Sequence, residues 1–190
     1  MGPHEFWTAI RTNSVVTEIL ERAPRLDLPD WYLTAGGLFQ TVWNYRSGYD
    51  PQTGIRDYDF FYFDDSDLSY EAEDRVIQQA EELFGDLAVD VEVRNQARVH
   101  LWYADHFGAE LSPYRSSEDA IDHFVSTTCC FRVRTDPDGT PRVYAPHGYE
   151  DVFDGIIRPN PRLPMRHVYE AKAERWKSIW PNLTVLPWEA

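Results

Sequence analysis

The spacing of apolar residues along the chain predicts alternating helices and strands. Some stretches have an apolar residue every three or four positions, which is the period of an amphipathic helix. These stretches are residues 5–21, 38–47, 69–84, 97–107, 116–127, 150–157 and 165–180. Shorter runs are aromatic, β-branched or strictly alternating, which is typical of strands. These runs are residues 31–34, 57–63, 89–93, 130–135 and 142–145.

Turn-forming segments separate these elements. Gly36-Gly37 ends the first strand and opens the next helix, and Asp136-Pro137-Asp138-Gly139 joins the last two strands as a β-hairpin. The chain has 190 residues, 43% of them hydrophobic, which is enough for one packed core. We therefore predict a single domain over residues 1–190, with a core at about 25–135 and a helical C-terminal extension at about 146–190.

The charge of the chain narrows the classes of partner. It contains 32 acidic residues against 18 Lys and Arg, a formal net charge of −14 at pH 7. Proteins that grip duplex nucleic acid gain affinity by neutralising phosphates with Lys and Arg. The acidic surplus therefore argues against a nucleic-acid partner, although a local basic patch would permit one. A nucleotide escorted by magnesium is compatible with this charge.

Cysteine use and hydropathy predict a cytoplasmic protein without a membrane partner. The two cysteines, Cys129 and Cys130, are adjacent, and a vicinal pair closes a disulfide only through a strained ring. No apolar run approaches the roughly 20 residues that a membrane helix requires. The first residues lack the basic and apolar regions of a signal peptide.

Two of the predicted strands carry carboxylates on one face. Asp57 and Asp59 are two positions apart, so in a strand they project the same way, about 7 Å apart. Asp90 and Glu92 have the same spacing on the second strand, opposite its valines. Carboxylates this close repel each other unless a cation neutralises them. If the two strands are neighbours, three acids can meet at a divalent-cation site of the kind that supports phosphoryl transfer.

A helix N-terminus precedes the first pair of acids. Gly36 and Gly37 would present backbone N–H groups and the positive end of a helix dipole, where phosphate binds readily. Gln40, one turn into this helix, could contact phosphate or base, or belong to plain helix surface. Arg98 follows the second acidic strand, where it could bind phosphate bidentately or support the fold. These four residues form the predicted nucleotide-binding set.

The order of these motifs resembles a known superfamily. Ala35-Gly36-Gly37, Asp57-Tyr58-Asp59-Phe60 and Val91-Glu92-Val93 are similar to the glycine turn, the Asp-hydrophobic-Asp strand and the single-carboxylate strand of DNA polymerase β-like nucleotidyltransferases. Longer strings resemble a bacterial nucleotidyltransferase family within that superfamily, over about residues 31–188. These strings are residues 41–45, 62–73, 94–103 and 158–161.

This resemblance implies both a fold and a catalytic site. The fold would be α+β, a mixed β-sheet flanked by helices and followed by C-terminal helices. Asp57 and Asp59 would be catalytic and bind Mg²⁺ or Mn²⁺, and a carboxylate of the second strand would complete the site. Glu92 is our choice, because the family's acid has an apolar residue on each side. Asp90 satisfies the same local rule and stays open.

The resemblance also implies an activity. A nucleoside monophosphate would be transferred from ATP or another NTP to an acceptor, expected to be a small molecule or a protein, with release of pyrophosphate. A metal-dependent phosphohydrolase shares paired carboxylates but usually recruits histidines, and no His lies between Asp57 and Glu92. The non-catalytic alternative is a nucleotide-binding or toxin-neutralising module of the same fold.

Overall fold

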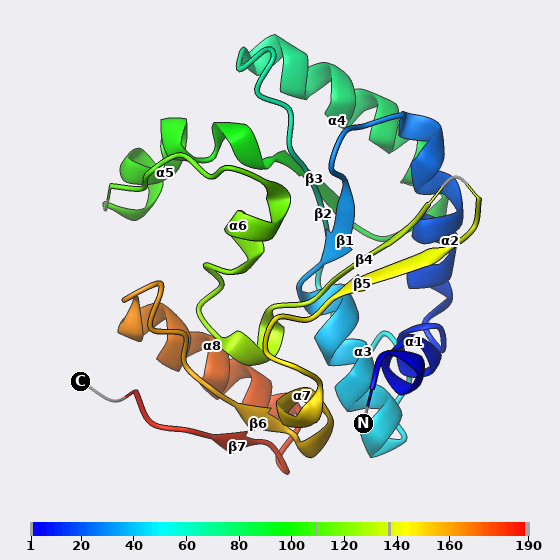
Figure 1. Cartoon of the computed structure of the whole chain (residues 1–190). Coiled ribbons are helices and arrows are strands. Elements are labelled where there is room, and N and C mark those ends of the chain that lie inside the picture. The colour runs from blue at the N-terminus through cyan, green and yellow to red at the C-terminus, as the bar shows by residue number, and fades with distance from the viewer. Residues whose placement is uncertain (1, 109, 137, 189–190) are drawn as a thin grey trace.

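A computed structural model describes residues 2–108, 110–136 and 138–188 (Figure 1). Pro137 of the predicted hairpin turn and both ends of the predicted domain lie outside these ranges. The helices are α1 (Pro3–Ile10), α2 (Ser14–Arg22), α3 (Gly36–Ser47), α4 (Tyr70–Phe84), α5 (His100–Phe107), α6 (Ser117–Ile121), α7 (Glu150–Asp154) and α8 (Arg166–Ile179). The strands are β1 (Tyr32–Thr34), β2 (Tyr58–Tyr62), β3 (Val91–Asn95), β4 (Arg132–Thr135), β5 (Pro141–Tyr144), β6 (Ile156–Ile157) and β7 (Thr184–Val185).

A mixed five-stranded sheet organises the fold, in the order β3-β2-β1-β4-β5. Strands β2 and β3 are parallel, connected by α4, and the other neighbours are antiparallel. In Figure 1, α1 and α2 lie on one side of the sheet, and α5, α6 and α8 lie on the other. Strands β6 and β7 form a separate parallel pair beside α7 and α8. The α+β architecture and the hairpin of β4 and β5 agree with the prediction from the sequence.

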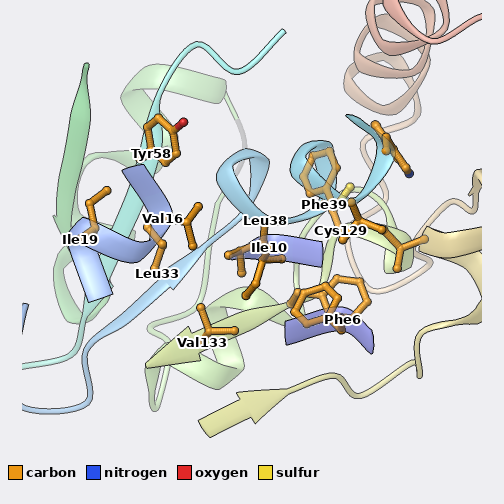
Figure 2. Close-up of a cluster of buried hydrophobic side chains, with 14 of the residues drawn as sticks. Phe6, Ile10, Val16, Ile19, Leu33, Leu38, Phe39, Tyr58, Cys129 and Val133 are labelled. Atoms are coloured by element: carbon orange, nitrogen blue, oxygen red, sulfur yellow. The ribbon is translucent and has the colours of Figure 1, made fainter. Parts of the chain in front are cut away.

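The main core joins side chains of the sheet and helices α1 to α4 with side chains of α7 and α8. Figure 2 shows Phe6, Ile10, Val16 and Ile19 of α1 and α2 packing with Leu33 of β1 and with other strand and helix side chains. These five side chains are almost completely buried. Burying one such side chain stabilises the fold by about 1.5–3 kcal/mol. This packing fixes the strands and helices that carry the site.

The predicted first helix is in fact two helices, separated at Asn13. The Asn13 side chain caps α2 by accepting a hydrogen bond from the Val15 N–H at 3.0 Å. Its Nδ2 donates to Thr41 Oγ1 at 3.1 Å and to the Tyr58 hydroxyl at 3.0 Å. Asn13 is fully buried, and a buried amide needs these partners. Apolar spacing alone does not reveal such a cap.

Two further predicted helices are shorter than expected. Helix α6 begins at the Ser116 cap, whose Oγ accepts from the Asp119 N–H at 3.1 Å, but it ends at Ile121. Short 3₁₀ turns connect the main elements, at Ala23–Leu26, Gly85–Leu87, Gln96–Arg98 and Thr127–Cys129. Helix α7 ends at Asp154, because Gly155 has a φ of 70° and the next two residues form β6.

Both cysteines are free and buried. Among the described helices, none combines the length and apolarity needed to cross a membrane.

Candidate active site

Strand β2 separates a core face from a face that carries the candidate chemistry. Tyr58, Phe60 and Tyr62 are buried in the core. Asp59 and Phe61 alternate with them, and Asp57 precedes the strand on the same side as Asp59. The alternation seen in the sequence therefore holds, and both aspartates face away from the main core.

The register of the sheet brings a third carboxylate to this pair. Asp59 lies directly opposite Glu92 on the parallel strand β3. Asp90 precedes β3, its carbonyl accepts from the Tyr58 N–H at 2.8 Å, and its side chain is exposed. Asp57, Asp59 and Glu92 all line one cleft, and Asp90 does not. The geometry therefore favours Glu92 over Asp90 as the third acid.

This cleft has a volume of about 420 Å³ and is bounded by segments distant in sequence. The acids at β2 and β3 line it, as do Gly36 and Gln40 at the start of α3. Trp102 of α5 and Lys172 of α8 complete the lining from the helices. Most of the predicted site residues thus share one space large enough for a nucleotide-sized ligand.

The electrostatics of the cleft centre on Asp59. Burial, together with the negative charges of Asp57 and Glu92, raises the pKa of Asp59 to about 7, against the opposing effect of Lys172 and Arg94. The folded protein thus holds Asp59 where its ionised form is poorly compensated by the protein alone. A bound cation would supply the missing compensation.

The donor chemistry of the three acids fits a divalent cation such as Mg²⁺, which prefers carboxylate oxygens. Within the described ranges, however, no three Asp, Glu, His or Cys side chains are already arranged closely enough to hold an ion. Glu92 instead forms a 2.9 Å ion pair with Arg94, and the two side chains are 39% and 40% exposed. An exposed pair of this kind contributes only about 0–1 kcal/mol, so a cation can readily displace Arg94.

The two glycines at the start of α3 serve different sides of the molecule. Gly36 lines the cleft, and a Cβ there would lie 2.5 Å from Gln40 Nε2. Gly37 faces the core, where a Cβ would lie 2.7 Å from the Tyr58 ring. Ala35, just before them, has a φ of 53°, a conformation that residues with a Cβ rarely adopt. No side chain in the described part of the chain caps this helix N-terminus, so it can receive an anion.

Gln40 and Arg98 have different environments. Gln40 lines the cleft, and its buried Oε1 has no hydrogen-bond partner among the described residues. Arg98 is buried and does not line the cleft. Its guanidinium forms an ion pair with Glu73 of α4 and donates to the Leu68 carbonyl at 2.9 Å. The structure therefore assembles the predicted nucleotide-binding set except Gly37 and Arg98, whose surroundings are those of structural residues.

Comparison with known families agrees with this geometry. Residues 21–185 match a family described as nucleotidyltransferase. The chain belongs to that nucleotidyltransferase family. An NMR structure described as revealing the head domain of a CCA-adding enzyme is similar to this chain, with a TM-score of 0.79 and 24% sequence identity. The match covers 98% of this chain and 97% of that chain, and shows that the two share a fold. A comparison with curated proteins finds no match. The resemblance and the α+β fold predicted from the sequence are confirmed.

The nucleotidyltransferase cleft also contains residues that sequence reasoning missed. Lys172 and Arg175 of α8 face the acids, although they follow Asp57 by more than a hundred positions. His123 and Tyr114, next to α6, contribute another part of the lining. Lys172 and Arg175 are three positions apart, a spacing that places both on one side of the predicted last helix and could have signalled them. The sequence offered no comparable signal for His123 and Tyr114.

Proposed function

We propose that this nucleotidyltransferase transfers a nucleoside monophosphate from an NTP in a Mg²⁺- or Mn²⁺-dependent reaction, to the hydroxyl of a small molecule or a protein. The observation that supports this most strongly is the convergence of Asp57, Asp59 and Glu92 in one cleft, through the pairing of Asp59 with Glu92. Gly36 and Gln40 border the same cleft and offer polar groups to a nucleotide.

In this reaction the acceptor oxygen forms a bond to the α-phosphorus, and the bond from that phosphorus to the β-phosphate oxygen breaks. The electron pair of the broken bond leaves with pyrophosphate, and the acceptor proton passes to a nearby base. Asp57 and Asp59, with Glu92, would hold the divalent cation, which neutralises charge on the phosphate oxygens. The start of α3 would orient the phosphates through its backbone N–H groups.

The acceptor class follows from charge and space. A net charge of −14 repels a long polyanion, and a cleft of about 420 Å³ accommodates little beyond a nucleotide and a small acceptor group. The structural neighbour is described by a CCA-adding activity, so RNA is the acceptor to test against a small molecule or protein. The charge favours the latter two.

A labelled-transfer assay tests the proposal. The protein is incubated with each α-labelled NTP and Mg²⁺ or Mn²⁺, with a cell extract divided into small-molecule, protein and RNA fractions. We expect transfer to a small-molecule or protein acceptor, and loss of transfer on adding a chelator. Transfer only to RNA would overturn the acceptor assignment, and chelator-resistant transfer would overturn the metal requirement.

Variants of the acids make the assay specific. Asp57→Asn, Asp59→Asn and Glu92→Gln should each reduce transfer by roughly a thousandfold or more, because each removes charge from the cation site. Asp90→Asn is the matched control, since Asp90 is exposed near the same strand end but outside the cleft. Retention of activity in Glu92→Gln with loss in Asp90→Asn would assign the third carboxylate to Asp90.

A further inference from the structure

Two basic residues of α8 face the acids of the cleft without contacting them. Lys172 and Arg175 both line the cleft, one turn apart on the helix. Neither side chain forms an ion pair or a hydrogen bond with any residue that the structure describes. The Nε of Arg175 is buried, so it has lost water without gaining a protein partner. Because this buried nitrogen belongs to a side chain that also lines the cleft, it is available to a ligand bound there.

The acids lie close enough to influence these cations. The positive charge of Lys172 lowers the pKa of Asp59. Burial lowers the pKa of the Arg175 guanidinium, and the negative charge of Asp57 raises it. Yet no carboxylate lies within ion-pair distance of either group in the described part of the chain. Acids on β2 and β3 and cations on α8 therefore face each other across open space. An anionic ligand that also binds a metal would fit between the two sets.

We propose that Lys172 and Arg175 form the polyphosphate-binding side of the cleft, and hold the β- and γ-phosphates of the donor NTP and the pyrophosphate product. This inference rests on the proposed nucleotidyltransferase function. Arg175 supplies a planar set of N–H donors suited to phosphate oxygens, and Lys172 supplies a mobile point charge. The C-terminal extension thus contributes directly to donor binding.

The arrangement along α8 also orients the donor. Arg175 is followed by Trp176, which packs against Phe39 near the start of α3, with ring centroids 5.2 Å apart. The other end of α8 lies near α5, where the Tyr103 hydroxyl donates a hydrogen bond to Met165 Sδ at 3.0 Å. From Met165 to Arg175 the helix rises about 15 Å. The polyphosphate therefore lies at the α3 end, and the rest of the cleft, towards α5, is left for the nucleoside and the acceptor.

Binding of inorganic tripolyphosphate, of AMP and of ATP, each with Mg²⁺, tests the proposal without depending on the acceptor, and the wild-type protein is also tested with the other three NTPs. Calorimetry compares the wild-type protein with Lys172→Gln, Arg175→Gln and Arg175→Lys. We expect each Gln variant to weaken tripolyphosphate and ATP binding roughly tenfold or more, and to change AMP binding less than about twofold. Arg175→Lys should recover part of the loss, because it restores charge but not the planar donor set.

Arg166→Gln is the control on the same helix, because Arg166 is exposed and paired with Glu170 at 2.7 Å. It should bind all three ligands like the wild type, and melting curves should show that every variant is folded. Equal loss of AMP and ATP binding, or no loss in either Gln variant, would overturn the inference and leave the proposed function standing. Failure of the wild type to bind any of the four NTPs would overturn both.

Discussion

The two faces of strand β2 have the same backbone but opposite roles. On one face Tyr58, Phe60 and Tyr62 are buried against helices, and Phe60 stacks on Trp31 with ring centroids 5.4 Å apart. On the other face Asp57 and Asp59 lie in the cleft, where burial and the neighbouring carboxylates raise the pKa of Asp59 and disfavour its charged form. The core face therefore stabilises the fold, and this stabilisation offsets the destabilising effect of the acids held on the cleft face.

This comparison gives a rule for variants of the strand. Changes on the core face should lower stability and affect activity only through folding. Changes to the acids of the cleft face should alter activity or ligand binding while leaving stability unchanged or improved.

The largest expected effect on stability comes from Phe60→Ala on the core face. Phe60 is fully buried and contacts Trp31 and Phe84, so truncation removes apolar burial and leaves a cavity. The free energy of unfolding in urea should fall by about 3–5 kcal/mol. Phe61→Ala, on the cleft side of the same strand, is the comparison and should cost less. An equal loss in both variants would contradict the division into two faces.

Asp59→Asn should stabilise the metal-free protein, whereas Phe60→Ala destabilises it. The pKa of Asp59 is about 7 when folded against an ordinary value of 3.8, so the folded state binds more protons than the unfolded state between these pH values. Stability contributed by the protonated form is thus lost as the pH rises from about 4 to 7. At pH 8 in a chelator, Asp59→Asn should be more stable than the wild type by about 2–4 kcal/mol, with little difference at pH 4.

Adding Mg²⁺ sharpens this test. The wild-type melting temperature at pH 8 should rise with Mg²⁺ concentration, because a ligand of the folded state stabilises it. Asp59→Asn should respond less, since it has lost one ligand. A wild-type protein whose stability does not depend on pH between 4 and 7 would show that Asp59 titrates normally, and the uncompensated charge would then no longer support a cation site.

The paired glycines allow a smaller test of the same division. Gly37→Ala places a Cβ against the Tyr58 ring, which is held by its hydrogen bond to Asn13, so the free energy of unfolding should fall by about 1–3 kcal/mol. Gly36→Ala meets only the flexible end of Gln40, and should cost less while weakening nucleotide binding. Urea unfolding and calorimetry separate the two effects. The reverse order of stabilities would show that Gly37 is not a core residue.

The carboxylate pattern was the part of the site that sequence could predict. Strict alternation places Asp57 with Asp59 and Asp90 with Glu92 on any strand, whatever its neighbours. The choice between Glu92 and Asp90 needed the register of β2 and β3, since strand pairing decides which residue lies opposite Asp59.

Contacts between distant segments could not be predicted from local patterns. The sequence makes Arg98 a candidate phosphate ligand, but in the fold its guanidinium pairs with Glu73 of α4. Lys172 and Arg175 belong to the site only because the fold brings α8 into the same cleft as the acids. The break at Asn13 likewise depends on Thr41 and Tyr58, which follow it by 28 and 45 positions. In each case a tertiary partner overrides what periodicity suggests.

The smallest expected effect is at Ala35, where the cleft face stores strain in the backbone. Its φ of 53° and ψ of −136° suit glycine better than a residue with a Cβ, and such strain costs on the order of 1–3 kcal/mol. Ala35→Gly removes the strain but adds freedom to the unfolded chain, which costs about 0.5–1 kcal/mol. The net gain in unfolding free energy should be about 1 kcal/mol.

Ala88→Gly is the matched control, because Ala88 has a φ of 55° in the milder left-handed helical region and lies outside the cleft, so it should gain less stability. A loss of stability in Ala35→Gly, measured by urea unfolding, would show that this turn is not strained and that the cleft face costs the fold only through its charges.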